Sequence, residues 1–214
     1  SSYTLTINTT EISINATGDS IVGFINANNT LVTFVELSPV ALATAFVEEA
    51  LNFTTVTSGF AKTSNYWKGN LGTVGTYFNY GLANKKIASG TDGYIELSYE
   101  AGDGESAILA FRLNAVNEAY HTSSAYKAGA FIYSGTIYKI DNGSVTSTAT
   151  GISTGEFLRV SRTGSVLKVQ KRAGATITDV ATLSFSSTAD LFIQGNTDQT
   201  ERLYDPIGAN LVAV

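Results

Sequence analysis

The segment from residue 130 to residue 174 constrains the fold more than any other part of this 214-residue chain. Short apolar runs alternate with polar residues in it, and glycine-containing turns separate them. Its last two runs, Phe157–Arg162 and Val166–Arg172, flank Thr163-Gly164-Ser165, which favours a tight reversal. Alternation with a period of two is typical of a half-buried strand, so the segment predicts antiparallel hairpins. The residues expected to hold the sheets together are Phe157, Val160, Val166 and Val169.

The composition favours β structure. Hydrophobic residues make up 43% of the chain and charged residues 14%, which indicates a folded protein whose polarity comes mostly from Ser, Thr and Asn. Tyr and Phe, at 11 each, favour strands. From residue 53 onward the pattern is strand after strand, which predicts an all-β, two-sheet antiparallel sandwich. The predicted strands are Phe53–Val56, Gly75–Tyr80, Gly93–Tyr99, Ala107–Leu113, Ala130–Tyr133, Thr136–Ile140, Phe157–Arg162, Val166–Arg172, Ile177–Phe185 and Leu191–Gln194.

Residues 1–52 differ from the rest. Apolar residues alternate with Thr, Asn and Ser up to Leu37, which predicts a small β meander. Ser38-Pro39 then supplies an N-cap and a first-turn proline, and the apolar spacing that follows predicts one helix over 38–51. The apolar face of this helix either packs over the meander or serves as an oligomerisation or docking surface.

Charge and residue usage exclude several kinds of partner. The formal net charge is −5, whereas nucleic-acid binding depends on a basic surface, so no nucleic acid is expected. The absence of cysteine excludes disulfides, thiolate metal sites and a cysteine nucleophile. The longest apolar stretch, Val40–Phe46, is far shorter than the roughly 20 residues of a membrane span, so no membrane insertion is expected. The first residues show no signal-peptide pattern.

An ordered series of short blocks resembles the concanavalin A-like, laminin-G-like jelly-roll sandwiches. The blocks are Gly59–Lys62 with Trp67–Gly69, Gly93–Leu97, Ala110–Leu113, Phe131–Tyr133, Ile137–Gly143, Gly155–Val160, Asp190–Ile193 and Ile207–Leu211. The resemblance covers residues 53–214 and implies a lectin-like domain there, of the kind found in phage spike or tail proteins and bacterial surface proteins. Residues 1–52 are then expected to form a β-rich anchoring or assembly segment.

Some members of this superfamily are laminarinase-like hydrolases, whose acidic residues alternate along one strand. Glu96 and Glu100 match the outer positions of that pattern, and strand alternation places them on one face. The middle position is Ser98, so the carboxylate that tunes the pair is missing. The expectation is that the chain is not an enzyme.

Other catalytic and metal sites have weak support. His121 is the single histidine, and no Gly-x-Ser-x-Gly motif accompanies it. No cofactor is expected, although sandwiches of this class can bind calcium through loop carboxylates. The candidate ligands are Asp103, Glu105 and Asp141, each of which is explained equally well by a turn.

Carbohydrate sites combine an aromatic face with Asn, Asp or Gln side chains that bond to sugar hydroxyls. Each aromatic residue taken singly is as well explained by core packing. The group expected to supply this chemistry is Tyr66, Trp67, Tyr77, Asn79, Tyr80, Tyr120, His121 and Tyr126.

The leading hypothesis is a non-enzymatic, lectin-like attachment protein that binds a cell-surface glycan or host receptor. We expect it outside the cell, on a virion or bacterial surface, and assembled as a homo-oligomer or with a partner through residues 1–52. The alternative is a purely structural virion, assembly or surface protein whose sandwich is a spacer. A glycan hydrolase is the weakest alternative.

Overall fold

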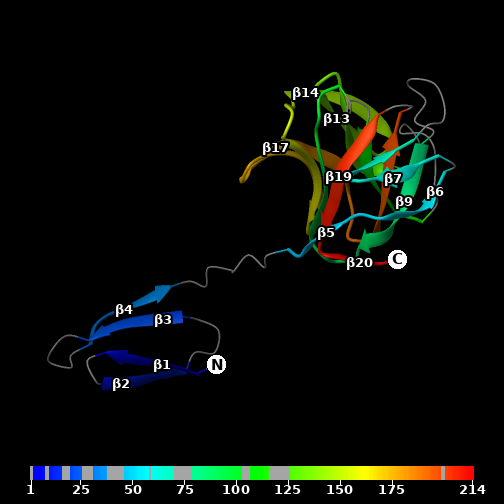
Figure 1. Cartoon of the computed structure of the whole chain (residues 1–214). Helices are drawn as coiled ribbons and strands as arrows, with labels where there is room; N and C mark the ends of the chain where they lie inside the picture. Colours follow the sequence, from blue (N-terminus) through cyan, green and yellow to red (C-terminus); the bar gives the residue numbers. More distant parts are fainter. Residues whose placement is uncertain are drawn as a thin grey trace. The chain divides into compact units, whose positions relative to one another are not determined.

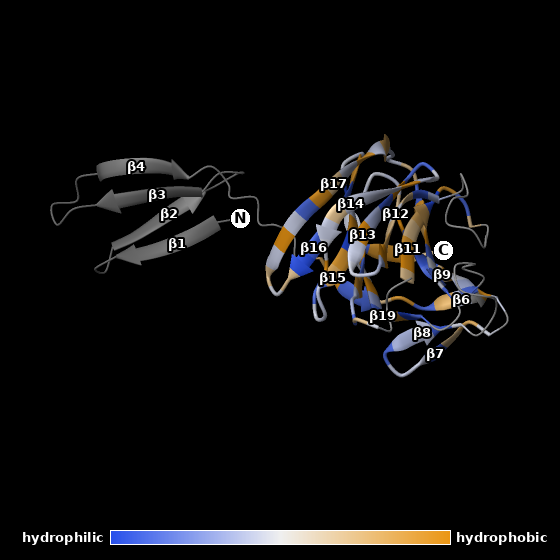
Figure 2. Ribbon diagram, turned by 90° about the horizontal axis from the view of Figure 1, so that it is seen from above, coloured by the Kyte–Doolittle hydropathy of each residue, from blue (hydrophilic) through white to orange (hydrophobic). Residues whose placement is uncertain are grey.

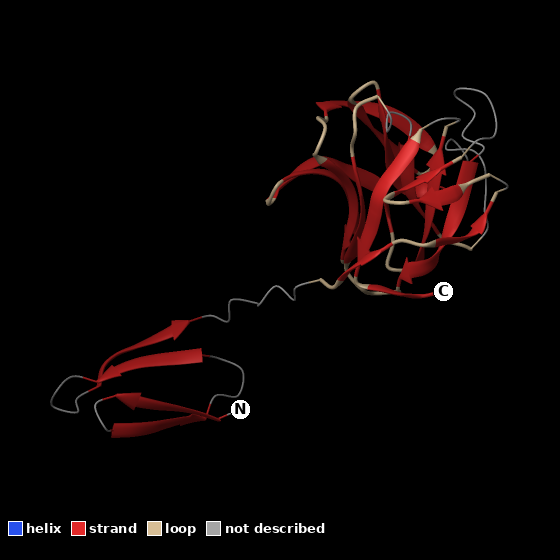
Figure 3. Cartoon of the chain, viewed as in Figure 1, coloured by secondary structure: helices blue, strands red, loops and turns tan. Residues whose placement is uncertain are grey.

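The computed structural model describes residues 2–7, 10–15, 20–25, 31–37, 46–57, 59–69, 79–102, 107–115, 126–198 and 201–214. The chain divides into two compact units, Ser1–Ala45 and Phe46–Val214. The described residues contain strands, turns and loops (Figure 3). None of their elements is a helix long and apolar enough to cross a membrane.

The first unit consists of two separate hairpins. β1 (Ser2–Ile7) pairs antiparallel with β2 (Thr10–Asn15), and β3 (Ser20–Ile25) pairs antiparallel with β4 (Leu31–Leu37). The strands expected in this region are therefore present. They form two two-stranded sheets instead of one continuous meander, because no pairing joins β2 to β3 among the described residues.

The second unit is a sandwich of two antiparallel sheets (Figure 1). The first sheet has the order β17-β16-β15-β10-β19-β8-β7, with β5 also paired to β19, and the second has the order β14-β13-β12-β11-β18-β9-β20, with β6 paired to β9. The strands of the first sheet are β5 (Glu48–Ala50), β7 (Ala61–Thr63), β8 (Tyr66–Lys68), β10 (Gly93–Ser98), β15 (Phe157–Thr163), β16 (Val166–Ala173), β17 (Thr176–Ser186) and β19 (Arg202–Ala209). Those of the second sheet are β6 (Phe53–Val56), β9 (Asn79–Ile87), β11 (Ala107–Arg112), β12 (Tyr126–Tyr133), β13 (Thr136–Asp141), β14 (Ser144–Gly151), β18 (Leu191–Thr197) and β20 (Leu211–Ala213).

The predicted helix over 38–51 is wrong where the structure describes it. Residues 38–45 lie outside the described part, but Glu48–Ala50 is β5, which pairs with Ile207–Ala209 of β19. Leu51, next to it, is 1% exposed and belongs to the sandwich core. Pairing with an open strand edge and burial of Leu51 outweigh the helical spacing of the apolar residues. The compact sandwich unit therefore begins at Phe46 and not at Phe53.

The core lies between the inner faces of the two sheets. Ile95 and Leu97 of β10 and Val160 of β15 face it from the first sheet, and Leu109 and Phe111 of β11 face it from the second. β11 is apolar from Ala107 to Phe111, which its colour in Figure 2 reflects. Alternation along each strand therefore decides which side chains join the sheets.

The hairpin of β15 and β16 confirms the expected reversal. Thr163 pairs with Val166, so Gly164 and Ser165 form the turn, and Gly164 has a φ of 60°. Val160 and Val169 are core residues. Phe157 and Val166 are not, because each lies three positions from its core valine and so on the opposite face. Phe157 is half-buried, and Val166 is 41% exposed.

Candidate functional site

Strand β19 shares one of its edges with two short strands. β8 pairs with β19 from Arg202 to Tyr204, and β5 pairs with it from Ile207 to Ala209. Asp205 and Pro206 lie between these two ladders. On the other edge of β19 the register with β10 also shifts here, between Glu96 and Ser98. The sheet therefore has a local break at Asp205-Pro206, where proline supplies no backbone donor.

Backbone hydrogen bonds hold the two sides of this break. The Asp205 N–H donates to the carbonyl of Asn65 over 2.7 Å, and the Leu51 N–H donates to the carbonyl of Pro206 over 2.8 Å. Asp205 and Ser64 have φ values of 38° and 54°, a region that few residues other than glycine adopt. The chain thus keeps β5 and β8 apart along β19 and accepts local strain in doing so.

A cavity of about 340 Å³ lies at this break, and we call it the sheet-break pocket. Its volume falls at the lower end of the range for small-molecule sites. Its wall is apolar on Leu51, Trp67, Pro206 and Ile207, whereas the other lining residues carry polar or small side chains. The residues that line the sheet-break pocket are Ala50, Leu51, Lys62, Ser64, Asn65, Trp67, Asp205, Pro206 and Ile207.

Trp67 contributes to this pocket as a wall and not as an exposed stacking platform. Its ring stacks on Phe60 at 5.5 Å and meets Phe53 edge-on at 5.1 Å, so Trp67 is 7% exposed. Trp67 therefore lines the pocket without presenting an open ring face, because the ring packs in the core. Its buried indole nitrogen has no hydrogen-bond partner among the residues that the structure describes.

Two other predicted sugar contacts are buried in the second sheet. Tyr126 is fully buried, and its hydroxyl donates to Oδ1 of Asn196 over 3.1 Å and accepts from Nε2 of Gln194 over 2.7 Å. Asn79 is fully buried as well, and its Nδ2 lies 3.5 Å from the carbonyl of Asp198. Because both side chains are fully buried, the structure gives no support to a direct contact of either with a glycan.

The remaining predicted contacts are partly accessible or lie outside the described residues. Tyr66 is half-buried at the start of β8, where its ring meets Tyr204 edge-on at 5.4 Å and Arg202 lies 4.8 Å from its centroid. Tyr80 is half-buried on β9 and is not one of the residues that line the pocket. Tyr77, Tyr120 and His121 fall outside the described part of the chain.

The carboxylate of Asp141, one of the candidate calcium ligands, takes part in hydrogen bonds within the fold. It accepts hydrogen bonds from the backbone N–H groups of Ser184 and Phe185 and from the Ser184 hydroxyl, at 2.7, 3.0 and 2.9 Å. Burial raises the pKa of Asp141, but these hydrogen bonds and nearby Lys139 outweigh it and hold the pKa below the usual value. Asp103 and Glu105 lie outside the described residues. In the part that the structure describes, no three His, Cys, Asp or Glu side chains are placed to hold a metal ion.

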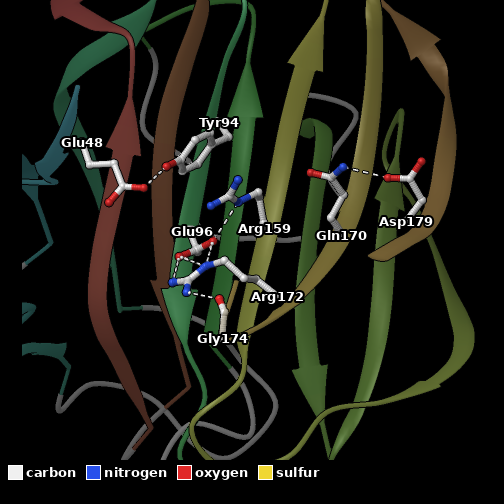
Figure 4. A network of polar contacts seen from close by, with 8 residues as sticks. All are labelled: Glu48, Tyr94, Glu96, Arg159, Gln170, Arg172, Gly174 and Asp179. Atoms are coloured by element: carbon white, nitrogen blue, oxygen red, sulfur yellow. Dashed lines mark hydrogen bonds and ion pairs between the residues drawn. The ribbon is translucent and has the colours of Figure 1, made fainter. Parts of the chain in front are cut away.

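Glu96 is a structural residue on the outer face of the first sheet (Figure 4). It is fully buried, and its Oε2 lies 2.7 Å from Nε of Arg159 while its Oε1 lies 2.5 Å from Nη2 of Arg172. Two guanidinium groups therefore occupy the carboxylate that a hydrolase would need for catalysis. Beside them, the Arg159 guanidinium lies 3.5 Å from the centroid of the Tyr94 ring, which helps to cover the ion pair.

Tyr94 is an uncharged residue next to the ion pairs of Glu96 with Arg159 and Arg172. Its hydroxyl donates to the Glu48 carboxylate of β5, as Figure 4 shows. Burial, together with this hydrogen bond, raises the pKa of Tyr94 to about 12. These contacts thus join β5 to β10 and β15.

Several residues of the sheet-break pocket carry no recognisable signal in the sequence. Ser64, Asn65 and Asp205 meet because β5 and β8 pair with the same strand, and pairing over more than 130 residues of sequence is not visible in local patterns. Asp205-Pro206 is the one local sign, since proline interrupts a strand ladder.

Comparison with solved structures reveals the fold. The PSpry domain of TRIM65 aligns with a TM-score of 0.51 and 12% identity over 78% of this chain and 93% of that chain. The stonustoxin structure aligns with a TM-score of 0.52 and 9% identity over 76% of this chain and 28% of that chain. A legume lectin-like domain from Entamoeba histolytica aligns with a TM-score of 0.47 and 8% identity over 78% and 87% of the two chains. No protein-family model matches the sequence, and no curated protein matches it.

At these identities the likeness concerns the fold and not the ligand. The two sheets, their antiparallel order and the similarity to the PSpry domain confirm the expected architecture. The second unit of the chain is a concanavalin A-like jelly-roll sandwich.

Proposed function

We propose that the chain is a non-enzymatic recognition protein that binds a surface carbohydrate in the sheet-break pocket. The observation that carries this proposal is the lining of the pocket, where Lys62, Asn65 and Asp205 surround an apolar wall. Carbohydrate sites combine such a wall with a few polar groups that bond to hydroxyls. The absence of catalysis is supported by Glu96, whose carboxylate is held by two arginines.

The biological setting that fits this proposal is attachment at a virion or bacterial surface. The first unit consists of two-stranded hairpins, which are marginally stable alone and gain stability from association. This supports a role for residues 1–45 in assembly, with a second copy or another component of the same particle. The spike or tail of a phage, or the outer surface of a bacterium, is then the proposed location.

A structural role is the second candidate, and the burial of Trp67, Asn79 and Tyr126 favours it. These side chains hold the sandwich together, so a spacer domain would contain them as well. In that case the pocket would have no ligand, and the molecule would contribute only to assembly.

Glycan-array binding and ligand-observed NMR on the full chain distinguish the two candidates. We expect wild type to bind at least one class of surface glycan and Asn65→Ala to weaken that binding about tenfold, since the amide bonds directly to the ligand. Asn84→Ala is the matched control, because Asn84 is also exposed but lies on β9. Absence of binding to any glycan, with an intact fold by circular dichroism, would favour the structural role.

A further inference from the structure

The basic side chains of the sandwich are almost all paired. The 13 lysines and arginines of the chain all lie in its described part, and most bond to a carboxylate or a carbonyl. Lys85 pairs with Glu49 at 3.0 Å and Lys86 with Asp190 at 2.6 Å. The others with a hydrogen bond or ion pair are Lys127, Lys139, Lys168, Lys171, Arg112, Arg159, Arg162, Arg172 and Arg202.

Lys62 and Lys68 are the exceptions within that described part, since neither makes a hydrogen bond or an ion pair there. Both belong to the hairpin of β7 and β8, where Lys62 pairs in register with Trp67 and Lys68 with Ala61. Lys62 lines the sheet-break pocket. On a chain with a net charge of −5, unpaired positive charge is therefore concentrated at the hairpin that forms one side of the pocket.

Asp205 brings the opposite charge to the same pocket. It is exposed, and its carboxylate has no hydrogen-bond donor or cation beside it among the described residues. Lys62 and Asp205 do not pair with each other, although both line the cavity. The pocket thus presents three separate groups: an ammonium donor, a carboxylate acceptor and the Asn65 amide.

We infer that the sheet-break pocket binds an acidic sugar residue, of the uronate or sialate type, with its carboxylate on Lys62 and ring hydroxyls donating to Asp205. This inference rests on the proposed function and names its ligand class. A sugar carboxylate accepts the charge-assisted bond that Lys62 offers, while its hydroxyls satisfy an acceptor-only group such as Asp205. Lys68, on the opposite face of the hairpin from Trp67, adds attraction at longer range.

The test compares two probes that differ at one group of each sugar: an oligoglucuronate, and the same oligosaccharide after its carboxylates are reduced to uncharged hydroxymethyl groups. Titration calorimetry on the full chain should give an affinity roughly tenfold higher for the acid, falling as salt is raised. Lys62→Gln should remove this preference. Lys127→Gln is the matched control, because it changes the net charge equally but Lys127 lies on β12 and bonds to Asn142.

The results distinguish a failure of this inference from a failure of the proposed function. If the neutral oligosaccharide binds as tightly as the acid, and Asn65→Ala still weakens binding about tenfold, the inference is wrong and the carbohydrate site stands. If neither probe binds and no other glycan does, the proposed function itself is wrong. An oligosaccharide that carries sulfate groups and no carboxylate forms a third arm: binding equal to that of the uronate would overturn the carboxylate as the group recognised. Near-UV circular dichroism confirms that each surface variant is folded.

Discussion

The side chain of Arg172 on β16 reaches Glu96 on β10 across the intervening strand β15, with Nη2 2.5 Å from Oε1. The side chain of Arg159 on β15 bonds to the other oxygen of the same carboxylate. The hydrogen bond between Arg172 and Glu96, together with the negative charge of Glu96, raises the pKa of Arg172 above its usual value. One buried carboxylate therefore ties three neighbouring strands together on the outer face of the sheet.

Replacing Glu96 by Gln should destabilise the sandwich strongly. The change leaves the buried Arg159 without a counter-ion, and breaking a buried ion pair on one side costs about 3–5 kcal/mol. Urea denaturation of the two proteins measures the difference. Glu100→Gln is the control and should cost less than about 0.5 kcal/mol, since Glu100 follows β10 and takes part in no ion pair of the described residues. Equal effects of the two changes would contradict the structural role of Glu96.

The variant Asp141→Asn should show a stability defect that depends on pH. The folded state holds the pKa of Asp141 below its usual value, so the unfolded chain binds the proton more tightly. The stabilisation is therefore present above the unfolded pKa of about 4 and is lost as the pH falls through the folded value. We expect a difference of about 2 kcal/mol at pH 7. Denaturation curves from neutral to acidic pH test this, and a difference independent of pH would refute it.

Tyr94 should make the protein sensitive to alkali. Because the fold raises its pKa to about 12, the unfolded chain loses this proton first, near the ordinary tyrosine value of about 10. Stability then falls between about pH 10 and pH 12. The variant Tyr94→Phe should lose that part of the slope, whereas Tyr133→Phe, at a position that is 55% exposed, should keep it. Thermal melts of the three proteins in this range provide the measurement.

The turn between β12 and β13 offers a stabilising substitution. Ser134 and Gly135 have φ values of 48° and 68°, which correspond to a type I′ hairpin turn. Asn tolerates the first of these positions better than Ser, and the next hairpin uses Asn142-Gly143 with φ values of 49° and 81°. The variant Ser134→Asn should gain about 0.5 kcal/mol. A lower melting temperature in this variant would be incompatible with the assigned turn.

The strands of the sandwich were predictable where alternation and turn residues agree. The hairpin around Gly164 and the Asn142-Gly143 turn follow from local chemistry, and the structure has both. β5, β7 and β8 have three residues each, too few for a period of two to be recognised. The helix predicted near Glu48 shows the same limit, because the edge of β19 that pairs there lies far along the chain.

The candidate site was less predictable than the fold. Aromatic content indicates sugar binding and core packing equally, and Trp67 and Tyr126 are used for packing. The alternation of residues along the sequence likewise could not show that Glu96 contacts Arg159 and Arg172, since these partners lie more than 60 residues away along the chain. Accessibility is a property of the assembled sheets, so it cannot be derived from residue type alone.

Because of the break along β19, some residues of the pocket can be replaced without disturbing the strand pairing that holds the sandwich together. The pocket lining includes core residues such as Leu51 and Trp67, which change only at a cost in stability. It also includes exposed residues of the hairpin of β7 and β8, namely Lys62, Ser64 and Asn65. New sequences in that hairpin can alter charge and hydrogen bonding while the ladders on either side of Asp205-Pro206 remain in register. A domain with this arrangement can change the charge and hydrogen-bonding groups of this pocket while its jelly roll stays unchanged.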